Sequence, residues 1–166
     1  MFVLRATAKL RQRIGPSAPY EGEGSTTLLG DWYATMLPWR PQVALLVNER
    51  TLLPALMPLA PAATMAARVA DQVGEVLAAY GVPDSLIRAE IDQMSEYRIA
   101  PTANRSIVGV MNEFTFLADT WRDAARPNLV DLAVRLAATP CSPLYQRHVS
   151  PDRELTALLQ RTPTIW

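Results

Sequence analysis

Apolar residues recur every three or four positions over several stretches of the chain, a spacing typical of helices with one buried face. The clearest stretch lies between residues 61 and 80, and Gly81 marks its expected end. Pro83 then suits the first turn of a second helix. The same spacing predicts longer helices over 104–123 and 128–138, and shorter ones over 8–14, 28–37 and 151–160.

An unbroken apolar run over residues 43–47 instead predicts a strand that is buried on both faces. Residues 48–50 suit a tight turn, after which residues 51–57 return antiparallel to this strand. Pro54 has no N–H to donate to a neighbouring strand, so we expect the returning strand at a sheet edge or with a bulge. Two more strands are predicted over residues 2–7 and 97–100.

These elements predict one α+β domain, in which several helices pack on a small, partly antiparallel sheet of three or four strands. The chain has 166 residues, the usual length of a single domain. Residues 15–27 are rich in Gly, Pro, Ser and Thr and are predicted to form a surface loop. We expect the domain to span residues 1–166.

The composition narrows the classes of function. Sixteen basic and sixteen acidic side chains give a formal net charge of zero, whereas proteins that coat nucleic acid are usually basic. Cys141 is the single cysteine and His148 the single histidine, so we expect no disulfide framework, no metal site and no cofactor. No apolar run approaches the roughly 18 residues that indicate a membrane span. We expect a soluble cytoplasmic protein that contacts no membrane.

Four short segments are distinctive: FVLRAT at 2–7, LGDWY at 29–33, LVNERTLLP at 46–54 and TANRSIVGVMNEF at 102–114. Together they resemble a family of uncharacterised bacterial proteins that is described as a domain of unknown function. The resemblance covers most of the chain and implies a bacterial, cytoplasmic, single-domain protein. It implies no activity and no catalytic residues.

The first candidate site is the start of the helix predicted over 104–123. A helix N-terminus has backbone N–H groups without intrahelical partners and a positive potential, and an arginine there adds a two-pronged donor for phosphate or carboxylate. The alternative is an ordinary capped helix whose arginine is solvated or pairs with a structural carboxylate. The residues concerned are Thr102, Asn104, Arg105 and Ser106, with Asn112 on the same polar face as the arginine.

Two further candidates lie nearer the predicted hairpin. The tripeptide Asp31-Trp32-Tyr33 with Trp39 and Arg40 combines aromatic rings with an arginine, which can stack on a base or another ring. The alternative is core packing of the aromatic residues. Glu49, in the turn, would be a general acid or base if it faced Arg105, and turn chemistry alone is its alternative.

The remaining titratable residues carry weaker signals. Cys141 would need His148 as a base within hydrogen-bond reach to be a nucleophile, and a structural cysteine is the alternative. The acidic residues Glu90, Asp92 and Glu96 are expected on a solvated surface.

Three functions from different classes are consistent with these patterns. The first is a non-catalytic binding or interaction domain for an unidentified ligand, protein partner or second copy, with an exposed apolar surface near Trp39 or Trp166. The second is an enzyme or sensor for a phosphorylated small molecule or nucleotide, in which Glu49, Asp31 or Glu113 does acid–base work beside Arg105. The third, which zero net charge disfavours, is a nucleic-acid-associated protein whose arginines gather on one face. We expect the first function. Its more specific version is a domain that binds a small anionic ligand near residues 104–106.

Overall fold

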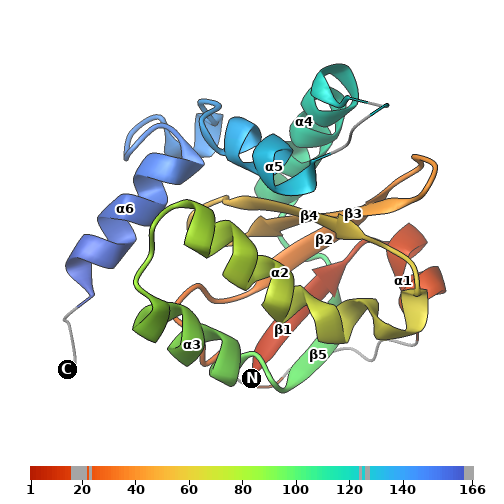
Figure 1. The fold of residues 1–166 in the computed structure, drawn as a ribbon, viewed down its shortest axis with the longest axis horizontal. Coiled ribbons are helices and arrows are strands. Elements are labelled where there is room, and N and C mark those ends of the chain that lie inside the picture. Colours follow the sequence, from red (N-terminus) through yellow and green to blue (C-terminus); the bar gives the residue numbers. More distant parts are fainter. Residues whose placement is uncertain (16–21, 23, 124, 126–127, 163–166) are drawn as a thin grey trace.

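The computed structural model describes residues 1–15, 22, 24–123, 125 and 128–162. Five strands form one mixed sheet in the order β4-β3-β2-β1-β5 (Figure 1). β1 (Phe2–Ala6) is parallel to both neighbours, β2 (Trp32–Leu37) and β5 (Tyr97–Pro101). β3 (Val43–Asn48) pairs antiparallel with β2 and with β4 (Pro54–Pro58). The α+β class is therefore as predicted, whereas the sheet has five strands rather than three or four.

The additional strand is β2, which lies within residues 28–37. The prediction of a short helix over these residues is therefore wrong. Trp32 pairs with Leu4 of β1 on one side and with Asn48 of β3 on the other. A strand between two strands has its backbone polar groups hydrogen-bonded on both sides. A helix at this position would leave the facing backbone groups of β1 and β3 without these partners. The aromatic residues Trp32 and Tyr33 favour a strand, but the local apolar spacing does not show it.

Helices cover both faces of this sheet. Figure 1 shows α2 (Met65–Ala79) and α3 (Asp84–Gln93) in front of it, and the start of α4 (Arg105–Trp121) behind it. α4 packs on β2 and β3, and α5 (Leu129–Ala137) lies along the edge strand β4. Every residue of β3 is buried, as expected for a strand covered on both faces.

The remaining elements follow the sequence pattern closely. α1 (Ala8–Ile14) and α6 (Pro151–Arg161) lie where predicted. The helix expected from residue 61 starts as the 3-10 turn η1 (Ala62–Thr64), and a second such turn, η2 (Ser142–Leu144), follows α5. Within the predicted loop 15–27, residues 16–21 and 23 lie outside the described residues. None of the described helices is both long and apolar enough to span a membrane.

Pro54 begins β4, the last strand of the sheet, so the prediction of an edge strand is confirmed. The strand starts three residues later than predicted because residues 49–52 make a wider turn. In this turn the backbone N–H of Leu52 donates to the carbonyl of Asn48 (2.9 Å) and the N–H of Asn48 donates to the carbonyl of Leu53 (3.0 Å).

Glu90 is not solvated as expected, since only 5% of it is exposed. Its carboxylate accepts hydrogen bonds from the backbone N–H groups of Leu28 (2.9 Å) and Leu29 (3.0 Å). It thereby attaches α3 to the segment that leads into β2. Burial raises the pKa of Glu90, and the two N–H donors and Arg50 act in the opposite direction. Asp92 and Glu96 are exposed, as expected.

Candidate functional site

The turn between β3 and β4 is organised by Asn48, whose side chain is fully buried. Its Nδ2 donates to the carbonyls of Leu29 (2.7 Å) and Asp31 (3.3 Å). Its Oδ1 accepts from the backbone N–H groups of Arg50 (3.1 Å) and Thr51 (3.0 Å) and from the Thr51 hydroxyl (3.0 Å). One amide side chain therefore fixes the turn that presents Glu49 and Arg50.

Glu49 is held against the start of β2. Its Oε1 accepts from the Asp31 N–H (2.9 Å), and the Asp31 carboxylate is paired with Arg5 Nε (2.8 Å) and accepts from Ser25 Oγ (2.6 Å). Gly30 has a φ of +75°, and a Cβ on it would lie 2.3 Å from Glu49 Oε1, so the close approach requires glycine. Asp31 is thus engaged in structure, and Glu49 lies beside it.

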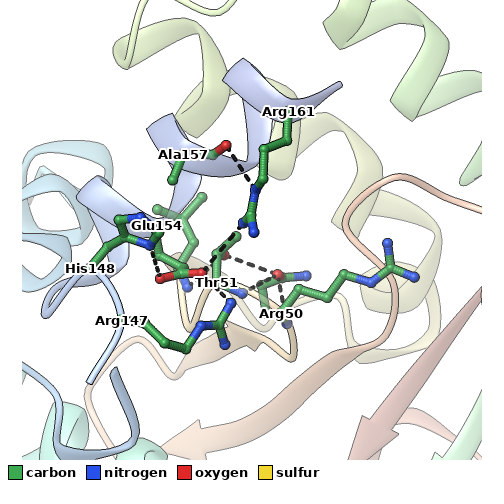
Figure 2. Close-up of polar contacts among 9 residues, drawn as sticks. Arg50, Thr51, Arg147, His148, Glu154, Ala157 and Arg161 are labelled. Atoms are coloured by element: carbon green, nitrogen blue, oxygen red, sulfur yellow. Dashed lines mark hydrogen bonds and ion pairs between the residues drawn. The ribbon is translucent and has the colours of Figure 1, made fainter. Parts of the chain in front are cut away.

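A second polar cluster comes from the end of the chain (Figure 2). Glu154 of α6 is 1% exposed, and its carboxylate pairs with Arg147 and with His148 Nδ1 (2.8 Å). Arg161, about two turns further along α6, lies 3.8 Å from the same carboxylate. A buried carboxylate with several cationic neighbours has its charge compensated, so Glu154 orients the two arginines.

These two clusters meet in a cleft. Two hollows of about 200 and 100 Å³ share Glu49, Arg50 and Arg147 in their walls. The larger extends to Glu154 and Arg161 of α6, and the smaller extends to Asn104, Ser106 and Ile107 at the start of α4. We call this the arginine cleft. Its charged wall residues are three arginines and two glutamates.

The structure divides the predicted anion-site residues between the cleft and the open surface. Asn104 and Ser106 line the cleft with Glu49. Arg105 and Asn112 are exposed on α4, and Thr102 is half-buried, and none of these three is among the residues that line the cleft. Asn104 Oδ1 accepts from the N–H groups of Ser106 (2.9 Å) and Ile107 (3.4 Å), so part of the helix N-terminus is already capped.

Two non-glycine residues in or near this cleft have a positive φ. Leu52, in its wall, has a φ of +59°, and Val149, next to His148, has a φ of +73°. Positive φ is uncommon outside glycine and is an outlier for a β-branched residue. Such strain persists where the surrounding structure enforces it, which is often at functional sites.

The sequence interpretation missed Arg147, Glu154 and Arg161. Their segment shows an irregular turn and a short helix, and nothing local indicates that it folds back onto the β3–β4 turn. One sequence feature could have indicated this cluster: charged residues at 147, 152, 153 and 154 lie close to His148, the single histidine.

The other sequence candidates are not assembled into catalytic sites. Trp32 is fully buried at the start of β2, whereas Trp39 follows the end of that strand, so the aromatic candidate is divided in two. Trp39 is itself buried, at 7% exposed, and Trp166 lies outside the described residues. Glu113 is exposed on α4 and is not in the cleft wall.

Cys141 is a structural residue. It is fully buried, its Sγ lies 3.4 Å from the carbonyl of Thr139, and burial raises the pKa of its thiol to about 12. His148, the base it would need, is bonded to Glu154 instead. No group of His, Cys, Asp and Glu among the described residues has the arrangement of a metal site.

Comparison with known proteins gives one relationship. A family model described as a domain of unknown function (DUF6933) matches residues 3–154 of the chain. The chain belongs to this family. No curated protein and no solved structure matches it. The DUF6933 match includes Arg50, Asn104, Arg147 and Glu154 of the arginine cleft and ends before Arg161.

Proposed function

We propose that this DUF6933 protein is a binding domain for a small anionic ligand, which it holds in the arginine cleft. The observation that carries the proposal is that Arg50 and Arg147, from segments almost a hundred residues apart, line the same concave surface. Arginine presents several N–H donors in a planar fork that matches phosphate and carboxylate groups.

Both arginines are held in place and still have donors to offer. Arg50 Nη1 donates to the carbonyl of Leu28 (2.6 Å), and Arg147 pairs with Glu154. Each of these contacts engages one nitrogen of a guanidinium that carries five N–H donors. A ligand anion between them would therefore meet side chains that are already oriented, which lowers the entropic cost of binding.

The start of α4 supports the same ligand chemistry. Ser106 lies in the cleft wall in the first turn of this helix, where the helix dipole favours a negative charge. The two hollows, of about 200 and 100 Å³, are each smaller than the roughly 300–1,000 Å³ of sites that enclose a whole drug-sized ligand. We therefore place only the acidic group of the ligand in the arginine cleft.

The test is a thermal-shift titration with inorganic phosphate, pyrophosphate and a nucleoside triphosphate. Because a ligand that binds only the folded state raises the melting temperature, we expect a concentration-dependent rise for at least one of these anions. Ser106→Asp is the sharpest variant, since a carboxylate in the first turn suits the helix but repels an anion. We expect the rise to be lost in Ser106→Asp and in Arg50→Ala.

Two matched arginine variants serve as controls. Arg88→Ala removes an exposed arginine from α3, and Arg105→Ala removes the exposed arginine beside the cleft. We expect both to retain the full shift. The proposal is wrong if none of the three anions shifts the melting temperature, or if the shift survives in both Ser106→Asp and Arg50→Ala.

A further inference from the structure

A larger cavity, of about 600 Å³, lies at the other end of β3 from the arginine cleft. It is formed where the loop between β2 and β3 meets the end of α4 and the start of α5. A second hollow of about 250 Å³ adjoins it and shares Trp39, Arg122, Asp123 and Leu129 with it. Cavities of a few hundred to about 1,000 Å³ with mostly apolar walls are typical of small-molecule sites.

The wall of this cavity is apolar with a few charges. Its apolar part consists of Pro38, Trp39, Pro41, Val43, Pro58 and Leu129. Its charged side chains are Arg40, Arg122 and Asp123. Asp119 lies 3.8 Å from Arg122 and offsets its charge, so Arg40 is the cationic group of this wall that favours a ligand with a negative charge.

Trp39 and Arg122 form a fixed stacked pair in this wall. The Arg122 guanidinium carbon lies 4.5 Å from the centroid of the Trp39 ring. Asp119 holds both, because it accepts from Trp39 Nε1 (3.2 Å) and lies 3.8 Å from Arg122 Nε. Because Trp39 is 7% exposed and Arg122 lies over its ring, the plane that remains open to a ligand is the Arg122 guanidinium, which is held in position before a ligand arrives.

We infer that this cavity is a second ligand site, which takes a flat aromatic ring carrying an acidic group. The ring would lie against the Trp39–Arg122 pair and the prolines, since aromatic and guanidinium planes favour stacking. The acidic group would pair with Arg40, which is exposed on the loop at the cavity rim. The site is independent of the arginine cleft, so either can fail without the other.

The experiment compares two fluorescent probes that share the same rings. The first is 1-anilinonaphthalene-8-sulfonate, which carries an acidic group, and the second is N-phenyl-1-naphthylamine, which does not. We expect saturable binding of the sulfonate at a single site and binding of the uncharged probe that is weaker by about tenfold or more, the value of one charge-assisted hydrogen bond. Arg40→Ala should weaken the sulfonate to the level of the uncharged probe, and Arg88→Ala should leave both unchanged.

The location is tested by ¹⁵N NMR of the indole N–H groups, assigned with Trp→Phe variants. The Trp39 signal should move on addition of the sulfonate, and the signal of Trp32, buried at the opposite end of β2, should not. The titration itself uses the wild-type protein, and it distinguishes binding in the cavity from adsorption of an apolar dye to exposed surface. Absent saturation, equal affinity for the two probes, or an unmoved Trp39 signal would each overturn the inference.

Discussion

At the scale of single residues, buried polar side chains do the positioning. Asn48 makes five hydrogen bonds, three of them within the β3–β4 turn. Glu90 accepts from two backbone N–H groups, and Glu154 orients Arg147 and His148. A buried polar group that loses its partner costs about 1–3 kcal/mol. Each of these three residues is therefore sensitive to changes that would be harmless on the surface.

Asn48→Ala should lower the free energy of unfolding by roughly 3 kcal/mol, because it strands several buried donors and acceptors at once. Asn48→Asp should be as harmful, since it turns an oxygen toward the carbonyls of Leu29 and Asp31 in place of a donor. Urea denaturation measures both. Asn112→Ala, on the exposed face of α4, is the matched control and should change stability by about 0.5 kcal/mol or less. A similar small effect at Asn48 would contradict its assigned role.

At the scale of elements, α6 is buried much less extensively than α2. α2 buries eight residues along its length, whereas α6 buries only Pro151, Glu154 and Leu155. All three lie in its first five residues, and beyond them Leu158 and Leu159 pack against the core while only partly buried. Elements with few buried apolar contacts open at lower free energy than the core.

Hydrogen–deuterium exchange should therefore show that α6 exchanges faster than α2. Leu155→Ala should accelerate exchange in α6 and leave α2 unchanged, because it removes the buried apolar anchor of that helix alone. Ligand in the arginine cleft should slow the exchange of α6, since Arg161 and Glu154 belong to the cleft wall. Equal protection of α2 and α6 would show that α6 is an integral part of the cooperative core.

At the scale of the whole molecule, the two hollow regions lie at opposite ends of β3. The arginine cleft borders the turn that follows Asn48, and the large cavity borders Val43. The strand between them is buried throughout and hydrogen-bonded on both sides. The sheet thus supports two separate surfaces on one rigid frame.

Stability of the whole molecule should fall in alkaline solution. Burial raises the pKa of Cys141 from 9.0 to about 12 and that of Tyr80 from 10.0 to about 12. In both cases the unfolded chain loses its proton first, so the folded state loses relative stability as the pH rises from about 9 toward 12.

The measurement is urea denaturation at a series of pH values from about 8 to 11. Cys141→Ala and Tyr80→Phe should each flatten the decline, and the double variant should flatten it most, because those protons no longer enter the linkage. An unfolding free energy that stays constant over this range in the wild type, or an equal decline in the double variant, would rule out this origin.

The local pattern of the sequence determines most of the elements. The helical stripe after residue 61, the apolar run at 43–47 and the edge position of Pro54 all follow from spacing and from backbone chemistry that acts over a few residues. The capping role of Asn104 also belongs to this local level, because its partners are two and three residues away.

Only the tertiary structure decides where charged residues meet. Trp32 and Tyr33 become part of a strand because β1 and β3 flank them, and Glu90 is buried because Leu28 and Leu29 reach it from another segment. Arg147 lines the same cleft as Arg50 although the two are about a hundred residues apart in the sequence. The spacing of residues encodes contacts within an element, whereas contacts between distant segments depend on the packing of the whole core, so the cleft could not be assembled from the sequence alone.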